Sequence, residues 1–252
     1  MDKGLLEMIF EEKFKNYKSL YLCVSGGVDS ALGLFLICKH LTENNINAKV
    51  TVATGVEPQP HYVRNDKNVK KIISIVKKMF PKINITHLVT FLDGYERPDS
   101  DDIEAFKKEF PKVQKMIIMH NKNWELGDYD LGISFQSSFP KLEELKKHEK
   151  LYQGSLFVGP EDRNWTGTKN DKIRNHSRGG GWWQPFLNMT KRDFEQLYVE
   201  NNLMSSLFPY TASCTGRAEN TDNFTKPCKK CFWCLEKYWA FDLFDLPEAY
   251  NL

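Results

Sequence analysis

Apolar and polar residues alternate along the first third of the chain in the manner of a parallel α/β fold. Short apolar runs at residues 20–24, 49–56 and 83–91 are typical of strands that are buried on both faces of a sheet. Between these runs, residues 30–41 and 63–80 carry apolar side chains at helical spacing. Strands that alternate with helices of this length predict a right-handed βαβ succession and a doubly wound parallel sheet with flanking helices.

The pattern weakens after residue 92, where shorter elements are expected. Further helices are predicted at residues 5–17, 101–110, 138–151, 190–203 and 232–244, and short strands at residues 116–119 and 153–158. Residues 164–181 are polar, basic and glycine-rich, and we predict a loop there. Thr190, with Asp193 three residues later, is the expected N-cap of its helix. We expect an α/β domain over residues 1–181 and a smaller helical region over residues 182–252.

A glycine-containing loop follows the first predicted strand. Its residues are Ser25, Gly26, Gly27, Val28, Asp29 and Ser30. Two glycines let the backbone approach a ligand, and the N–H groups at the start of the next helix favour an anion. The loop lacks the Gly-Lys-Ser/Thr of a Walker A loop and the Gly-x-Gly-x-x-Gly of a dinucleotide fold. A plain glycine turn is the alternative, but the strand, serines, aspartate and helix together favour a phosphate-binding loop.

The six cysteines are unevenly placed. Cys23 and Cys38 lie in apolar runs and are expected to be small buried hydrophobic residues. The other four fall within 21 residues and are Cys214, Cys228, Cys231 and Cys234. Such spacing is typical of a closed tetrahedral zinc site, and it also suits an iron–sulfur cluster. Four free buried thiols are the least favoured alternative.

Several segments resemble one enzyme family. The glycine loop resembles the S-G-G-x-D-S loop of the N-type ATP pyrophosphatases, also called the PP-loop superfamily. Residues 184–194 resemble the P-L-x-x-x-T-K-x-[DE] segment of the 7-cyano-7-deazaguanine synthases. Residues 211–214 and 227–235 resemble that family's W-S-C and P-C-G-x-C-x-x-C-x-x-R ending. Over residues 18–91 and 182–241 the chain is thus similar to a divergent member of that family.

The resemblance implies an adenine nucleotide alpha-hydrolase-like fold and an ATP-dependent carbon–nitrogen ligase. In that family, 7-carboxy-7-deazaguanine is adenylated and receives ammonia, and 7-cyano-7-deazaguanine, AMP and pyrophosphate are formed. ATP, Mg²⁺ and Zn²⁺ are the implied cofactors, and the zinc ligands are the four clustered cysteines. The implied catalytic residues are Ser25, Asp29, Ser30 and Lys191. The residues implied to bind ATP are Val24, Ser25, Gly26, Gly27, Val28, Asp29, Ser30, Ala53 and Lys191.

The roles of two of these residues have alternatives. Lys191, at a helix start, would neutralise the departing pyrophosphate, or it is a solvated lysine of the first helical turn. Asp29 would orient the loop, contribute to Mg²⁺ binding or cap the following helix.

Residues 92–181 lack the family's substrate-pocket segments in recognisable form, so three alternatives stay open. The first is a PP-loop enzyme that adenylates a different carboxylate, on a protein or a small molecule. The second is a tRNA thiolase with an iron–sulfur cluster. The third is a nucleotide-binding protein without turnover.

Composition narrows the partners. Lys and Arg total 35 against 33 Asp and Glu, and this net charge of +2 gives no strong nucleic-acid signal. The chain lacks an apolar run of the about 20 residues that a membrane span needs and lacks a signal-peptide pattern, so we expect a cytoplasmic protein. No glutaminase motif is apparent, which makes free ammonia the expected nitrogen source. A homodimer is compatible with the sequence.

Overall fold

The computed structural model describes residues 17–56, 63–91, 129–135, 137, 140, 174–175, 181–186, 189–216 and 218–252. The helix predicted at residues 101–110 and the strands predicted at residues 116–119 and 153–158 lie outside these ranges, as does the helix predicted at residues 5–17 apart from residue 17. The helix predicted at residues 138–151 also lies outside them, apart from residue 140.

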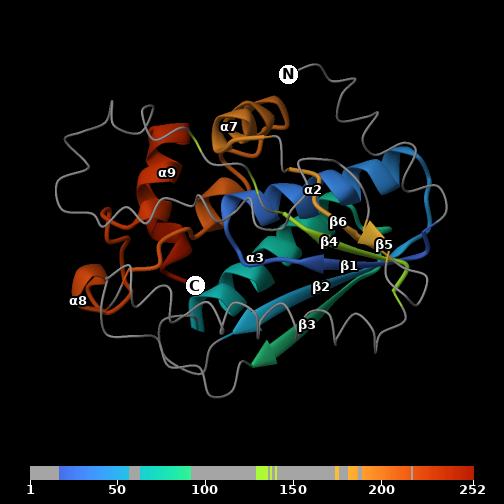
Figure 1. Ribbon diagram of the computed structural model, residues 1–252, viewed down its shortest axis with the longest axis horizontal. Helices are drawn as coiled ribbons and strands as arrows, with labels where there is room; N and C mark the ends of the chain where they lie inside the picture. Colours follow the sequence, from blue (N-terminus) through green and yellow to red (C-terminus); the bar gives the residue numbers. More distant parts are fainter. Residues whose placement is uncertain are drawn as a thin grey trace.

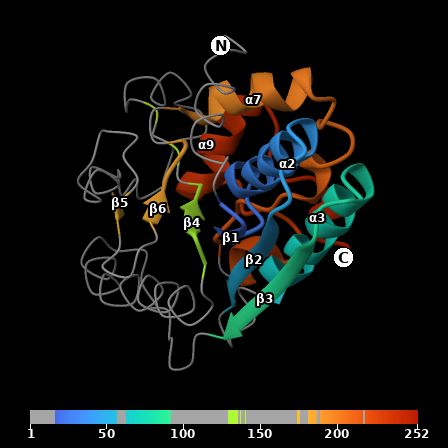
Figure 2. The same ribbon diagram turned by 90° about the vertical axis from the view of Figure 1, so that its right-hand side faces the viewer.

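One six-stranded sheet organises the chain, and Figure 2 shows its strands in the order β3-β2-β1-β4-β6-β5. The strands are β1 (Ser19–Cys23), β2 (Lys49–Val56), β3 (Ile85–Phe91), β4 (Leu131–Ser134), β5 (Arg174–Asn175) and β6 (Gly181–Trp183). Every neighbouring pair is parallel except β5 and β6. The predicted parallel α/β sheet is therefore confirmed.

The described helices α2 (Val28–Glu43), α3 (Val63–Met79) and α7 (Lys191–Glu200) lie on one face of this sheet (Figure 2). The crossovers from β1 to β2 and from β2 to β3 run in one direction across the sheet, and right-handed crossovers in one direction place their helices on one face. α2 is buried almost all round because α3 and α7 both pack against it.

The strand order reverses at β1, and this reversal creates the crevice of the fold. From β1 the chain moves outward through β2 and β3, whereas β4 lies on the other side of β1. β1 and β4 pair in parallel from Leu20↔Leu131 to Cys23↔Ser134. Open α/β sheets bind ligands outside the carboxyl ends of the two strands at such a reversal. In Figure 1 the carboxyl ends of β1 and β2 point toward the C-terminal helices.

Three strands, β4, β5 and β6, appear where the sequence pattern predicted none. Residues 164–181 were predicted as a loop, but β5 forms at Arg174–Asn175 and β6 begins at Gly181. These short strands are held by antiparallel backbone pairing, for which a glycine-rich segment carries no side-chain signal. β4 has only four residues, too few for a periodic pattern. The predicted boundary between residues 181 and 182 falls within β6 and stays a prediction.

The C-terminal region consists of short helices joined by turns. They are η2 (Phe208–Tyr210), α8 (Ala218–Thr221), α9 (Phe232–Phe241) and η3 (Pro247–Ala249). α9 was predicted to reach residue 244 but ends three residues earlier, because Asp242 adopts a left-handed φ of 51°. α7 was predicted to reach residue 203 and ends at Glu200, followed by Asn202 with a φ of 57°.

A close contact between α2 and the segment after β4 fixes the height of the helix over the sheet. Gly33 lies against the ring of Phe135, and a Cβ on Gly33 would lie 2.1 Å from a ring carbon. Phe135 in turn packs on Phe186, with ring centroids 5.7 Å apart. Position 33 therefore requires a residue without a side chain, even though glycine is a poor helix former.

We expect Gly33→Ala to destabilise the protein. The better helix propensity of alanine contributes about 1 kcal/mol, whereas forcing a methyl group into the Phe135 ring costs about 1–3 kcal/mol. Urea unfolding should therefore show a lower free energy of unfolding. Adding Phe135→Leu to Gly33→Ala should recover part of the loss, and a more stable Gly33→Ala single variant would contradict the packing argument.

Candidate functional site

The loop between β1 and α2 is shaped by its first glycine. Gly26 has a φ of 84°, in the region that L-residues rarely adopt. Its carbonyl accepts a hydrogen bond of 3.0 Å from the backbone N–H of Ala212. A Cβ on Gly27 would meet Ser25 Oγ at 3.6 Å, an ordinary contact. Gly26 is thus required by the backbone itself, whereas Gly27 keeps the loop surface open for a ligand.

The two loop serines close the turn at the start of α2. Ser25 N–H donates to Ser30 Oγ at 3.2 Å, and Ser30 Oγ donates to the carbonyl of Gly27 at 3.2 Å. The two hydroxyl oxygens lie 3.3 Å apart. Gly27 is the N-cap residue of α2, and no described side chain caps this helix. The first N–H groups of α2 therefore form the kind of helix N-terminus that binds an anion.

A second layer of contacts holds the base of the loop. Val24 N–H donates to the carbonyl of Ala53 at 2.9 Å, and Thr54 Oγ1 donates to the carbonyl of Val24 at 3.0 Å. Because the Thr54 hydroxyl donates there, its oxygen accepts from His87 Nε2, 2.9 Å away. Burial lowers the pKa of His87, which favours the neutral ring that this arrangement uses.

Asp29 extends from the first turn of α2 toward the end of β4. Its carboxylate accepts a hydrogen bond of 2.9 Å from Ser137 Oγ and lies 3.6 Å from Lys191 Nζ. Asp29 does not cap α2, so that suggested role is wrong. The Tyr198 hydroxyl, 2.9 Å from the carbonyl of Val28, holds the same turn from α7. Burial and the charge of Asp29 raise the pKa of Tyr198, so its hydroxyl stays a donor.

Lys191 begins α7 and is 3% exposed, so the alternative of a solvated lysine is wrong. Thr190 N–H donates to Asp193 Oδ2 at 2.7 Å, which confirms the predicted helix start. The Lys191 ammonium donates to Glu236 Oε2 of α9 and lies 5.2 Å from the ring centre of Trp233. With Asp29 on its other side, the ammonium is held between two carboxylates from different elements.

The four clustered cysteines come together as one candidate metal centre. The Sγ atoms of Cys214, Cys228, Cys231 and Cys234 all lie within 4.8 Å of one another. Two of them, Cys228 and Cys234, are 4.0 Å apart. Tetrahedral zinc with Zn–S bonds of about 2.3 Å would place its sulfurs about 3.8 Å apart. The four sulfurs therefore fit a single ion, and a modest contraction completes the tetrahedron.

Backbone N–H groups point at these sulfurs. Gly216 and Cys228 N–H donate to Cys214 Sγ at 3.2 Å, and Cys231 N–H donates to Cys228 Sγ at 3.3 Å. Hydrogen bonds from Cys214 and the other cysteines lower the pKa of Cys228, and the same contacts raise the pKa of Cys214 and Cys234. Donors that stabilise thiolate charge are suited to a metal-binding knuckle.

Of the remaining cysteines, Cys38 is fully buried, and burial raises its pKa to about 12.

A buried ion pair anchors the segment that carries Cys214. Lys237 Nζ donates to Asp245 Oδ1 at 2.7 Å and to the carbonyl of Thr211 at 3.0 Å. Asp245 also accepts the backbone N–H groups of Ser213 and Cys214 at 2.9 Å. Burial lowers the pKa of Lys237, and the Asp245 carboxylate opposes this shift. Lys237 and Asp245 thus fix the segment that also donates to Gly26 through Ala212.

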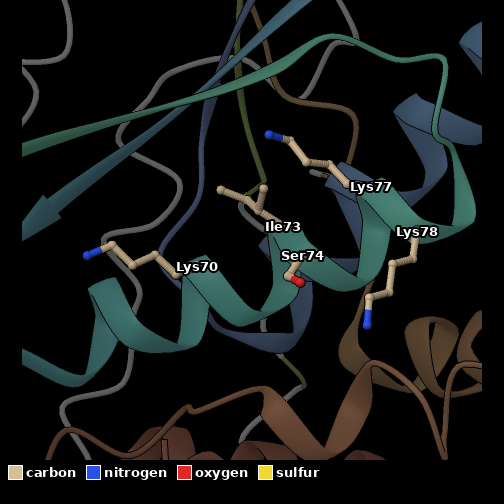
Figure 3. A pocket seen from close by; sticks show the side chains of 5 residues that line it. All are labelled: Lys70, Ile73, Ser74, Lys77 and Lys78. Atoms are coloured by element: carbon tan, nitrogen blue, oxygen red, sulfur yellow. The ribbon is translucent and has the colours of Figure 1, made fainter.

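A hollow of about 430 Å³ lies on the outer surface of α3, lined by Lys70, Ile73, Ser74, Lys77 and Lys78 (Figure 3). Its lining reaches the last turns of the helix. In a parallel α/β sheet these turns lie toward the amino ends of the strands, away from the glycine loop. The lysine side chains spread away from one another in Figure 3, so the hollow gathers no convergent polar groups. No helix among the described residues is long and apolar enough to cross a membrane.

Comparison with known proteins gives no family assignment. No family model matches the chain, and no curated protein matches it. A solved structure of U34-tRNA thiolase NcsA from Methanococcus maripaludis, with its [4Fe-4S] cluster, is similar at 12% identity. The match covers 94% of this chain and 76% of that one, with a TM-score of 0.48.

NAD+ synthetase from Burkholderia pseudomallei is similar at 11% identity. The match covers 98% of this chain and 83% of that one, with a TM-score of 0.43. Likeness at this level assigns no activity, and the α/β fold stands on the strand order and loop geometry described above.

Several residues of this site were not singled out from the sequence, among them Ser137, His87 and Glu236. Ser137 follows a four-residue strand that the hydrophobic pattern did not predict. His87 lies inside a predicted strand, with nothing local to indicate its contact with Thr54. Glu236 did carry a signal, because it is the acidic residue of the helix FWCLEKYWAF, which apart from Glu236 and Lys237 is aromatic and apolar.

We expect Lys237→Met to destabilise the protein by about 3 kcal/mol, because it leaves the buried Asp245 carboxylate without its cation. Lys226→Met is the matched control, since Lys226 and Asp222 form an exposed pair worth less than about 1 kcal/mol. Urea unfolding of both variants measures the difference. Equal free energies of unfolding for the two variants would contradict an anchoring role for the buried pair.

Proposed function

We propose that this protein is an ATP-dependent adenylating enzyme that binds the triphosphate at the glycine loop. The observation that carries the proposal is the convergence at the reversal of the sheet of an open helix N-terminus, two serine hydroxyls and a buried lysine. Phosphate groups are bound by N–H groups at a helix start and by charge-assisted contacts with lysine. The loop at the carboxyl end of β1 supplies the first, and Lys191 supplies the second.

The proposed reaction begins with attack of an acceptor carboxylate on the α-phosphorus of ATP. The new bond joins a carboxylate oxygen to phosphorus, the bond between the α-phosphorus and the α–β bridging oxygen breaks, and pyrophosphate leaves with the electron pair. Lys191 and the N–H groups of α2 neutralise charge on the departing pyrophosphate. Asp29 is the carboxylate placed to hold Mg²⁺, an ion that prefers oxygen ligands. No side-chain nucleophile is required, so positioning and electrostatics carry the catalysis.

Ammonia then attacks the acyl carbon of the adenylate, and the carbon–oxygen bond to AMP breaks to give an amide. We propose 7-carboxy-7-deazaguanine as the acceptor and 7-cyano-7-deazaguanine as the final product. In the second activation the amide oxygen attacks the α-phosphorus of another ATP and pyrophosphate leaves; the carbon–oxygen bond then breaks, AMP departs with the oxygen, and loss of the two nitrogen-bound protons gives the nitrile. The support for this acceptor is the resemblance of residues 184–194, 211–214 and 227–235 to the synthase family. Two adjacent polar side chains lie beside the crevice, where Gln184 Nε2 donates to Ser134 Oγ at 3.1 Å.

We propose zinc as the metal of the cysteine centre, held by Cys214, Cys228, Cys231 and Cys234. Four thiolates leave no open coordination position, so the metal would stabilise this region rather than act on substrate. The short distances between the sulfurs support a single ion. An iron–sulfur cubane bonds each thiolate to a different iron and needs a wider set of ligands. The sulfur spacing therefore supports zinc rather than a cluster at this centre.

The ATP reaction is tested by pyrophosphate release with 7-carboxy-7-deazaguanine and ammonium. Purified protein should release pyrophosphate and AMP in equal amounts, and Lys191→Met should reduce the rate by about 100-fold, because charge stabilisation at the leaving group is lost. Lys77→Met, on the outer face of α3, is the control and should retain the wild-type rate. Two outcomes would contradict the ligase proposal. One is pyrophosphate release in the absence of an acceptor, and the other is no pyrophosphate release with any carboxylate tested.

The metal is tested by elemental analysis together with absorption spectroscopy. We expect one zinc per chain, a colourless protein, and loss of the metal in Cys231→Ser because a tetrahedral thiolate site loses one of its four ligands. Cys38→Ser removes a thiol far from the centre and should keep the zinc. A brown protein containing several irons per chain, with visible absorbance near about 400 nm, would instead favour the thiolase alternative.

A further inference from the structure

We infer that Glu236 is a positioning residue for the nucleotide site, which holds the Lys191 ammonium at the mouth of the glycine loop and thereby links the cysteine centre to phosphate binding. This inference rests on the proposed function at the same loop. Glu236 neither touches the glycine loop nor ligates the metal. Its proposed role is to fix the position of the Lys191 ammonium.

Lys191 and Glu236 form a buried ion pair between two separate helices. Glu236 is fully buried in α9, and Lys191 is 3% exposed at the start of α7. Removing two such charges from water is costly unless they meet in good geometry. The Lys191 ammonium donates to Glu236 Oε2, so the pair can exist only when α7 and α9 are correctly docked.

The Lys191–Glu236 pair lies between the first turn of α2 and the cysteine centre. On one side, Lys191 Nζ is 3.6 Å from the Asp29 carboxylate, which belongs to the first turn of α2. On the other side, Glu236 lies two residues after Cys234 in the same helix, and Trp233 places its ring 5.2 Å from the same ammonium. Three separate helices of the site, α2, α7 and α9, thus meet at one charged atom.

The charge balance gives this arrangement its functional consequence. Asp29 alone would neutralise the Lys191 ammonium, so the Glu236 carboxylate is not needed to offset the cost of burying that charge. Two carboxylates around one ammonium leave a net negative charge, which an entering Mg²⁺ would offset by taking Asp29 as a ligand. Glu236 would then keep Lys191 in place while its other partner binds the metal. The lysine is therefore expected to stay at the loop when the triphosphate enters.

The test compares Glu236→Gln with the control Asp242→Asn, which removes one carboxylate from the exposed end of the same helix. Calorimetric titration measures the dissociation constants of pyrophosphate and of AMP in the presence of Mg²⁺. We expect Glu236→Gln to weaken pyrophosphate binding about tenfold and to leave AMP binding unchanged, because Lys191 serves the leaving phosphates. Glu236→Asp, which keeps the charge on a shorter side chain, should recover part of the affinity.

A second readout does not depend on nucleotide binding. The rate at which an amine-reactive reagent modifies Lys191, followed by mass spectrometry of the ligand-free protein, should rise several-fold in Glu236→Gln and stay unchanged in Asp242→Asn. If wild-type protein binds no pyrophosphate, the proposed function fails and this labelling rate alone decides the inference. Unchanged labelling, unchanged pyrophosphate affinity, or equal weakening of pyrophosphate and AMP would each overturn a positioning role for Glu236.

Discussion

The buried ammonium of Lys191 is the interaction on which the candidate site depends. A lysine 3% exposed is stable only beside negative charge, and its two carboxylates come from residues separated by more than 200 positions, Asp29 and Glu236. The arrangement therefore requires α2, α7 and α9 to be assembled at the same time. Misplacing α7 would leave both carboxylates without their cation, so the electrostatics of this single group favour the geometry around the glycine loop.

The supporting contacts share this dependence on distant segments. Tyr198 from α7 holds the first turn of α2, and Ser137 after β4 holds Asp29. Lys237 and Asp245 hold the strand-like segment that passes Gly26 and leads to Cys214. The glycine loop is thus surrounded by elements from three parts of the chain, and contacts with these elements hold it in one shape. A loop that is ordered in advance loses little conformational entropy when an anion binds.

Local sequence predicted the elements that have a strong local cause. Residues 49–56 form β2 as predicted, because a run of valine and threonine buried on both faces can be recognised without its neighbours. The N-cap at Thr190 and the knuckle cysteines were likewise visible, since capping and ligand spacing are properties of a few adjacent residues. β4 and β6 were missed because strands of four and three residues are held by their partners rather than by a pattern.

The candidate site divides along the same line. Ser25, Asp29 and Ser30 were found as a motif, but the burial of Lys191 was open from the sequence, since a first-turn lysine is ordinarily solvated. Its partner Glu236 is 45 positions away, and only tertiary packing brings the two together. One attachment in this region, from Ala212 N–H to the carbonyl of Gly26, belongs entirely to the main chain. Any residue except proline at 212 can supply it, so position 212 can change in composition across evolution while Gly26 stays joined to it.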